Sequence, residues 1–536
     1  MTHTAHKDTF ARDNLPPRKA WPELIFDLPG LEYPARMNCA VELLDGALLR
    51  GWRDRVAIRA ADGQCTYGQL LAQANRIARV LVEDMGLKPG NRVLLRGPNN
   101  PMMAACWFGV FKAGGIVVGT MPLLRAKELT DIVRKAEVTH ALCDKRLQAE
   151  LENALPACPT LTSIKYWYDD DAASLDSLCA TKPGSFRNVD TWAEDPALIA
   201  FTSGTTGTPK GTVHFHRDVV AMCDCFPRSC LKPVKEDIFC GTPPLAFTFG
   251  LGGLLCFPLR FGASTVLLEK LTPEGLLEAI HRFKATTCFT APTFYRQMAQ
   301  IAKSHNLKSL RKCVSAGEAL PDATRQLFRN ATGIEIIDGI GATEMIHIFI
   351  SHTPETVRRG ATGYAIAGYK ATVLDGKGKP CAPGVVGRLA VKGPTGCRYL
   401  ADERQSAYVQ KGWNVTGDAY AMDKDGYFFY QARTDDMIVS AGYNIAGPEV
   451  EGALLTHQAV AECGVIGAPD EERGQVVKAY VVLKLGYQKT EAVARMLQDH
   501  VKSTIAPYKY PRALEFVDVL PRTETGKLQR FKLRIR

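Results

Sequence analysis

The regular alternation of amphipathic helices with short apolar strands constrains the fold of this chain more than any other feature. Apolar residues recur at helical spacing over 70–84, and a short strand is expected at 92–95. The same helix-then-strand order returns over 104–118, 129–143 and 275–290. Because short loops between alternating elements place parallel strands side by side under helices, the pattern predicts an α/β protein with parallel or mixed sheets covered by helices.

The chain has 536 residues, which is too long for one ordinary core. From residue 384 the pattern changes to short strands and turns, and a compact α+β unit follows the polar quartet Arg433-Thr434-Asp435-Asp436. In that unit we expect helices at 448–455 and 491–501 and strands at 462–466 and 478–483. We therefore predict a large domain over 1–434 and a small one over 435–536.

Composition excludes several classes of protein. Lys and Arg total 66 against 56 Asp and Glu, a net charge of +10 that is spread without a basic run. Such an excess suits a nucleotide or coenzyme A, and we expect no nucleic-acid partner. The longest apolar stretch, 102–124, is interrupted by Lys112 and carries Gly109, Gly114 and Gly115, and the polar first 24 residues lack a secretory signal. We expect a cytoplasmic protein without membrane contact.

The 16 cysteines contain no Cys-x-x-Cys pair. Most have apolar neighbours, so we expect buried, reduced thiols and no zinc site.

The strongest local signal is the segment Thr202-Ser203-Gly204-Thr205-Thr206-Gly207-Thr208-Pro209-Lys210-Gly211, which follows an apolar strand at 197–201. It holds three glycines, five hydroxyl side chains and one lysine, without a carboxylate. Glycines let successive backbone N–H groups turn toward one anion, while hydroxyls and a lysine add donors and charge. The segment is typical of a polyphosphate-binding loop, although Pro209 before the lysine distinguishes it from a Walker A loop.

This segment resembles the phosphate-binding signature of the adenylate-forming superfamily, which comprises acyl-CoA synthetases, peptide-synthetase adenylation domains and beetle luciferases. Further segments that resemble family motifs follow in family order over 338–344, 412–418, 433–438, 440–445 and 521–528. The resemblance covers nearly the whole chain. It implies a distorted β-barrel subdomain in the large domain and a small mobile lid at the C-terminus. Ala432 replaces the glycine that usually precedes Arg433.

The resemblance also implies a set of nucleotide-binding residues. Those expected to bind ATP are Thr202, Ser203, Gly204, Thr205, Thr206, Thr208, Lys210, Ala316, Gly317, Glu318, Asp338, Gly339, Ile340, Gly341, Ala342, Thr343, Asp418, Arg433 and Lys527. Within this set Asp418 would accept hydrogen bonds from both ribose hydroxyls. Glu344 would bind Mg²⁺, which usually takes one or two carboxylates with phosphate oxygens. Thr343, Glu344 and Lys527 are the expected catalytic residues, and Lys527 would neutralise charge at the α-phosphate.

Two further roles fall on the small domain. Asp435 occupies the hinge position in the family pattern. Ser440, Ala441, Gly442 and Tyr443 are expected to bind coenzyme A, although Tyr443 in an ordinary β-turn fits the sequence equally well.

The acid-binding residues are expected to be Phe247, Thr248, Phe249, Tyr295, Ala316, Gly341, Ile346 and His347. Two aromatic residues at positions i and i+2 could flank a flat ring, but a buried strand shows the same spacing. The segment 338–349 resembles the benzoate-CoA ligase and 2-aminobenzoate-CoA ligase branch, in which a histidine follows the glutamate by three residues. A histidine buried in the core is the alternative for His347.

The resemblance implies an ATP-dependent aryl-CoA ligase that forms an acyl-adenylate and then a thioester, with ATP, Mg²⁺ and coenzyme A as cofactor and substrates. Benzoate and 2-aminobenzoate are the favoured acids. Three alternatives remain open: a medium-chain acyl-CoA ligase, an adenylating enzyme that loads a carrier protein, and a non-catalytic nucleotide-binding protein on the same scaffold. The sequence leaves open whether the protein is a monomer or a homodimer.

Overall fold

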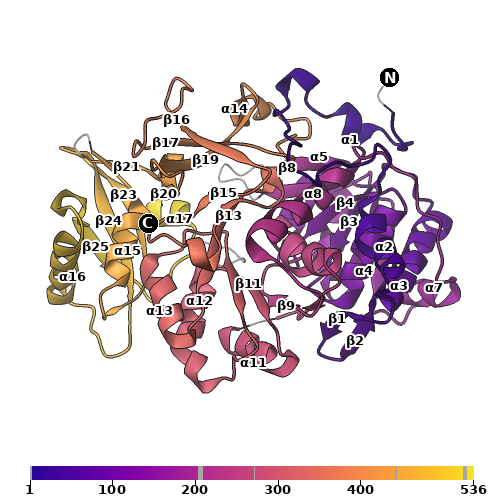
Figure 1. The fold of residues 1–536 in the computed structure, drawn as a ribbon, viewed down its shortest axis with the longest axis horizontal. Coiled ribbons are helices and arrows are strands. Elements are labelled where there is room, and N and C mark those ends of the chain that lie inside the picture. The colour runs from indigo at the N-terminus through magenta and orange to yellow at the C-terminus, as the bar shows by residue number, and fades with distance from the viewer. Residues whose placement is uncertain (1–2, 203–208, 271, 441–442, 523–527, 536) are drawn as a thin grey trace.

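The computed structural model describes residues 3–202, 209–270, 272–440, 443–522 and 528–535. Within these ranges no helix is long and apolar enough to cross a membrane. The described residues form a mixed α/β structure with four sheets, two in the first part of the chain and two smaller ones after them (Figure 1).

The first large sheet has six strands, and all but the last run parallel. Their order is β6 (Ser163–Trp167), β5 (His140–Asp144), β3 (Arg92–Arg96), β4 (Ile116–Thr120), β7 (Pro196–Thr202) and β8 (Lys210–Phe215). Strand β8 runs antiparallel to β7 and forms the edge of the sheet. The expected strands at 92–95 and 115–118 correspond to β3 and β4.

The second large sheet has nine strands with a parallel centre and antiparallel strands toward its ends. Their order is β15 (Tyr364–Ala365), β14 (Ile348–Ser351), β13 (Ile336–Gly341), β12 (Lys312–Ser315), β11 (Thr287–Thr290), β9 (Ile238–Gly241), β10 (Ser264–Val266), β1 (Val56–Ala60) and β2 (Gly63–Thr66). The two sheets together confirm the predicted α/β class. Both sheets are mixed, because each contains antiparallel strand pairs beside its parallel ones.

Helices cover both sheets. α3 (Tyr67–Arg79), α4 (Pro101–Lys112) and α8 (His216–Phe226) share one large core with strands of both sheets, including Val93 of β3 and Phe289 of β11. α5 (Ala126–Ala136) and α6 (Gln148–Ala154) pack on the other face of the six-stranded sheet. α11 (Pro273–Phe283), α12 (Pro292–Ile301) and α13 (Asp322–Thr332) pack on the other face of the nine-stranded sheet. The middle helices are therefore covered by a sheet on each side.

Helix α4 explains the long apolar stretch in the sequence. Residues 103–112 of this helix are all buried, including Lys112. The Lys112 ammonium donates to both carboxylate oxygens of Asp45, at 2.7 and 2.6 Å. A buried charge of this kind is stable only when it is paired. The stretch is therefore a core helix and a strand, as its interruptions indicated.

The two smaller sheets follow in sequence. A half-barrel contains β16 (Lys370–Leu374), β17 (Gly387–Lys392), β19 (Trp413–Met422), β18 (Val409–Gln410) and β20 (Phe428–Arg433). The C-terminal sheet contains β22 (Tyr443–Ile445), β21 (Ile438–Ser440), β24 (Gly474–Leu483), β23 (Val460–Asp470) and β25 (Ala513–Phe516), with α15 (Gly447–Leu455), α16 (Glu491–Thr504) and α17 (Arg530–Arg534). The boundary expected at 434–435 lies between the last strand of one sheet and the first strand of the next.

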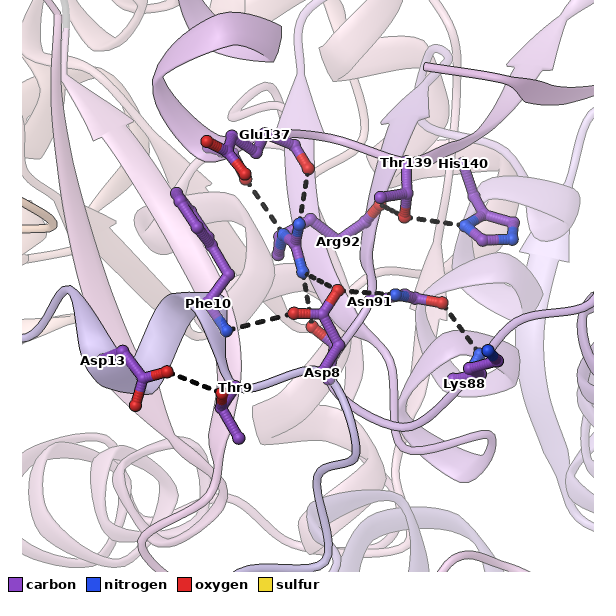
Figure 2. A network of polar contacts seen from close by, with 12 residues as sticks. Asp8, Thr9, Phe10, Asp13, Lys88, Asn91, Arg92, Glu137, Thr139 and His140 are labelled. Carbon is purple, nitrogen blue, oxygen red and sulfur yellow. Dashed lines mark hydrogen bonds and ion pairs between the residues drawn. The ribbon is translucent and has the colours of Figure 1, made fainter. Parts of the chain in front are cut away.

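The N-terminal segment is bound to the six-stranded sheet by the contacts that Figure 2 shows. Asp8 accepts hydrogen bonds from the side chains of Asn91 and Arg92, and the Arg92 guanidinium also donates to the carbonyl oxygens of Ala136 and Glu137. A Cβ on Gly90, whose φ is +92°, would lie 2.0 Å from the carbonyl oxygen of Asp8. Glycine at this position therefore allows the segment to lie directly against the sheet.

Candidate active site

The ends of the glycine-rich segment are held by a β-hairpin. Thr202, the last residue of β7, pairs with Lys210, the first residue of β8. Five of the expected phosphate-binding residues lie outside the described residues: Ser203, Gly204, Thr205, Thr206 and Thr208. Buried strands fix both ends of the segment, since every β7 residue except Thr202 is buried.

The second expected nucleotide segment lies beside this hairpin. It runs along β13 and then forms a 3₁₀ turn over Thr343–Met345. The Nε2 of His214, on β8, donates to the carbonyl oxygen of Thr343 at 2.7 Å. This contact joins the two segments, although 129 residues separate them.

A buried ion pair supports His214. The His214 Nδ1 lies 3.7 Å from the Asp218 carboxylate, and Arg398 donates to the same carboxylate oxygen at 2.8 Å. All three side chains are inaccessible to solvent. Burial opposes the ionisation of Asp218, but the Arg398 guanidinium holds the pKa of that carboxyl well below its usual range. Sequence analysis missed these residues, because single histidine and arginine residues in strands give no signal of their own.

Glu344, the expected magnesium ligand, is nearly buried within the 3₁₀ turn. One of its carboxylate oxygens accepts a hydrogen bond from the hydroxyl of Tyr399. The Lys210 ammonium lies 5.3 Å from the centre of the same tyrosine ring. The structure therefore brings Glu344 and Lys210 together around Tyr399, which sequence analysis also missed.

The expected ribose-binding residues are neighbours on two paired strands. Asp418 of β19 lies opposite Arg433 of β20, and Nη1 of Arg433 is 3.1 Å from Oδ1 of Asp418. A Cβ on Gly417 would lie 2.7 Å from Nη2 of Arg433. The absence of a side chain at Gly417 gives the guanidinium room beside Asp418.

Of the other residues expected to bind ATP, 316–318 follow strand β12 and 338–341 lie within strand β13. Ala316 is buried, and Gly317 has a φ of +90°, which favours glycine. Burial raises the pKa of Asp338 to about 7. Its Oδ1 has no hydrogen-bond partner among the described residues. Gly339, Ile340, Gly341 and Ala342 continue from Asp338 toward the 3₁₀ turn.

His347 lies in an aromatic cluster. Its ring centre is 4.5 Å from that of Phe257, 5.7 Å from Phe249 and 5.9 Å from Phe226. Neither ring nitrogen has a hydrogen-bond partner in the part of the chain that the structure describes. Burial lowers the pKa of His347 to about 3, so the ring is neutral at pH 7. The cluster includes one of the two predicted pocket phenylalanines, Phe249.

Backbone geometry directs the chain into this cluster. Ile346, between Glu344 and His347, is fully buried and has a φ of +65°, a conformation that β-branched residues rarely adopt. Thr248 begins the short helix α9 (Thr248–Gly250) and is buried, while Phe247 precedes it and is partly buried. A Cβ on Gly252 would lie 2.4 Å from Cδ2 of His347. Glycine at position 252 therefore makes the observed position of His347 possible.

Tyr295 does not belong to this cluster. Its hydroxyl donates to the carbonyl oxygens of Cys288 and Val314, each at 3.0 Å, and its ring packs edge-on against Phe328. The side chain is fully buried in the core between the nine-stranded sheet and its outer helices. Tyr295 therefore lies in a different core cluster from the phenylalanine rings that surround His347, and a role of Tyr295 in the acid pocket stays a prediction.

The C-terminal domain reaches the large domain next to the 316–318 segment. Arg522 donates to Thr293 at 3.3 Å and pairs with Glu318 at 3.6 Å, while its other terminal nitrogen pairs with Glu462 at 2.9 Å. Thr293 in turn donates to Glu318 at 3.0 Å. Lys527 lies outside the described residues, five positions after Arg522.

The expected coenzyme A and hinge residues lie near the start of the C-terminal domain. Ser440 ends β21 and is buried, and Tyr443 begins β22, where its exposed ring lies 4.6 Å from that of Tyr508. Ala441, Gly442 and the side chain of Asp435 lie outside what the structure describes. The roles expected for these residues therefore stay predictions.

Among the described residues no group of three or more histidine, cysteine, aspartate or glutamate side chains could hold a metal ion alone. A lone carboxylate such as Glu344 nevertheless fits Mg²⁺ bound chiefly through nucleotide phosphates, because this ion takes few protein ligands.

The chain is similar to known families, to several relatives of known name and to solved structures. The family model for AMP-binding enzymes matches residues 47–399, and that for the AMP-binding enzyme C-terminal domain matches 449–527. The chain is 35% identical to benzoate–CoA ligase of Thauera aromatica, over 94% of this chain and 97% of that one. It is 31% identical to human mitochondrial acyl-coenzyme A synthetase ACSM5, over 88% and 84%. The crystal structure of anthranilate CoA ligase AuaEII in complex with anthranoyl-AMP has a TM-score of 0.89 and 34% identity, over 94% and 98%.

Proposed function

Since this chain belongs to the family of AMP-binding enzymes, we propose that it activates benzoate or 2-aminobenzoate and transfers the acyl group to coenzyme A. Its relatives make it an AMP-forming CoA ligase of the aryl-CoA ligase group, with ATP and CoA as substrates. The proposal concerns the acid and the roles of individual residues.

The observation that carries the choice of acid is the environment of His347. Three phenylalanine rings surround the imidazole at different inclinations in an apolar cluster, and an aryl ring beside this cluster would make the edge-to-face or offset contacts that aromatic rings prefer. A neutral imidazole has one donor and one acceptor nitrogen. The acceptor nitrogen could take a hydrogen bond from an amine beside the carboxylate, which favours 2-aminobenzoate over benzoate.

We assign the adenylation step to residues that the two nucleotide segments bring together. The acid's carboxylate oxygen attacks the α-phosphorus of ATP, the bond to the β-phosphate oxygen breaks, and pyrophosphate leaves. Thr202 and Lys210 bind phosphate oxygens, Thr343 contacts the reacting phosphate, and Asp418 with Arg433 holds the ribose. Glu344 would hold Mg²⁺, which when bound neutralises phosphate charge. Lys527 would stabilise the charge at the α-phosphate.

In the second step the CoA thiolate attacks the acyl carbon, and AMP leaves with the electron pair of the broken C–O bond. We assign this step to a rotation of residues 435–536 about Asp435, which removes Lys527 and brings Ser440, Ala441, Gly442 and Tyr443 toward the adenylate. Domain rotation lets one pocket serve two transition states.

An acyl-CoA ligase for aliphatic acids is the second candidate, and the similarity to acyl-coenzyme A synthetases favours it. A deeper pocket around the His347 cluster would accommodate an alkyl chain.

The test is AMP formation from MgATP with benzoate, 2-aminobenzoate and octanoate, each with and without CoA. We expect turnover with the two aryl acids that depends on CoA. A preference for octanoate would contradict the aryl pocket while leaving the ligase chemistry intact. Adenylate that forms but is never discharged by CoA would indicate a carrier protein as the acceptor.

A further inference from the structure

Glu344 contacts Tyr399, a residue that is not among the expected site residues. Both side chains are buried, with 1% of Tyr399 and 9% of Glu344 exposed. The tyrosine hydroxyl donates to Oε1 of Glu344.

Tyr399 is itself held by several backbone contacts. It forms a β-bridge with Thr212 of β8, and the N–H of Leu400 donates to the carbonyl oxygen of Gly211 at 2.8 Å. Its own N–H donates to the side-chain oxygen of Gln405 at 2.9 Å. The tyrosine ring is therefore fixed relative to β8, the strand that begins at Lys210.

The same ring also contacts the expected phosphate-binding lysine. The Lys210 ammonium lies 5.3 Å from the ring centre, within the range of a cation–π contact. One tyrosine thus contacts both an acidic and a basic residue expected to bind MgATP. Without it, Glu344 and Lys210 would be free to approach each other, and an ion pair between them would withdraw both from the ligand.

We propose that Tyr399 is a positioning residue that holds one oxygen of Glu344 and separates the carboxylate from Lys210, so that the second oxygen remains available to the cation of MgATP. The proposal rests on the nucleotide site assigned above and goes beyond it, because it gives the orientation of Glu344 a specific cause. It concerns the affinity for Mg²⁺ in the nucleotide complex and is independent of the acid.

Tyr408 provides a matched control. Its ring centre lies 5.8 Å from that of Tyr399, in an edge-on contact. Its hydroxyl is buried and has no hydrogen-bond partner among the residues described. Tyr399→Phe and Tyr408→Phe therefore remove the same group from adjacent rings, and only the first removes a contact with Glu344.

The experiment is calorimetric titration of the full-length protein with ATP at a series of Mg²⁺ concentrations, without acid or CoA. We expect Tyr399→Phe to raise the half-saturating Mg²⁺ concentration about tenfold, because the variant loses the charge-assisted hydrogen bond that orients the Glu344 carboxylate. Tyr408→Phe should leave it at the wild-type value. ATP binding in EDTA should be the same in all three proteins.

Equal Mg²⁺ dependence in the two variants would overturn the proposal. If Tyr399→Phe does not fold, as circular dichroism would show, Tyr399→Trp replaces it, since the indole keeps an aromatic ring at this position but places no hydroxyl against Glu344. An unchanged Mg²⁺ dependence in Tyr399→Trp would also overturn the proposal. The proposed acid specificity could fail without affecting this result, because no acid is present.

Discussion

Arg522 of the C-terminal domain lies 3.6 Å from the carboxylate of Glu318 in the large domain and 2.9 Å from Glu462 in its own domain. The arginine therefore joins the two domains directly before the segment that contains Lys527. Arg296 of the large domain adds a second link, since its guanidinium donates to the carbonyl oxygen of Ala461 at 3.1 Å. These contacts define the domain orientation seen in the structure.

If this orientation supports adenylation, Arg522→Gln will slow adenylation more than thioester formation. Partly exposed ion pairs contribute up to about 1 kcal/mol, so we expect roughly a fivefold loss. Pyrophosphate exchange measures the first step, and single-turnover reaction of preformed adenylate with CoA measures the second. Lys489→Gln is the control, because Lys489 pairs only with Asp518 on the surface of the same domain in the described structure. Equal slowing of both steps would contradict the role in orientation.

Gly252→Ala tests whether the position of His347 determines acid binding. The new methyl group would lie 2.4 Å from the imidazole ring, so His347 has to move. Overpacking costs about 1–3 kcal/mol, and we expect the KM for the aryl acid to rise about tenfold with little change in the KM for ATP. Gly452→Ala is the matched control, since its Cβ would meet no described atom within 4 Å. If the KM for the acid stays at the wild-type value, the position of His347 does not determine acid binding.

Asp338 gives the protein a specific dependence of stability on pH. Its pKa is raised from 3.8 to about 7 by burial, so the folded state holds this proton more tightly than the unfolded state. Unfolding free energy should therefore fall as pH rises from about 4 to 7, by at most about 4 kcal/mol. Urea unfolding at a series of pH values between 4 and 8 measures this dependence of the unfolding free energy on pH. Asp338→Asn should flatten the dependence in this window, and parallel curves for variant and wild type would refute the assignment.

The buried pair of Asp218 and Arg398 is expected to be essential for stability. Removing one partner of such a pair leaves an uncompensated charge and costs about 3–5 kcal/mol. We expect Asp218→Asn to lower the urea midpoint strongly, because it leaves Arg398 buried without a carboxylate. Asp190→Asn, at an exposed pair with Arg36, should leave the midpoint almost unchanged. Similar urea midpoints for the two variants would mean that the buried pair contributes little to the free energy of unfolding.

The sequence could predict the elements and the segments that bear chemistry, because both have local signatures. Helical spacing located α3 and α4, and the glycine-rich segment 202–211 falls between two paired strands. The contact between His214 and Thr343 could not be predicted. It depends on how two sheets pack, and neither residue carries a local sign of the other.

The surroundings of Tyr295 could not be predicted from its position in the sequence. Thr293 and Tyr295 are two positions apart in α12, and residues at that spacing point to different sides of a helix. Thr293 faces Glu318 and Arg522, whereas Tyr295 faces the core. Only the helix α12 that contains both residues shows which of them faces the neighbouring segments.

The central claim is that the site around His347 binds an aryl acid, and a competition assay tests it most directly. The protein is given MgATP, CoA and equal concentrations of benzoate, 2-aminobenzoate and octanoate, and the acyl-CoA products are quantified by mass spectrometry. We predict that the two aryl thioesters form nearly all of the product, with 2-aminobenzoyl-CoA in excess. Octanoyl-CoA as the main product would contradict the claim.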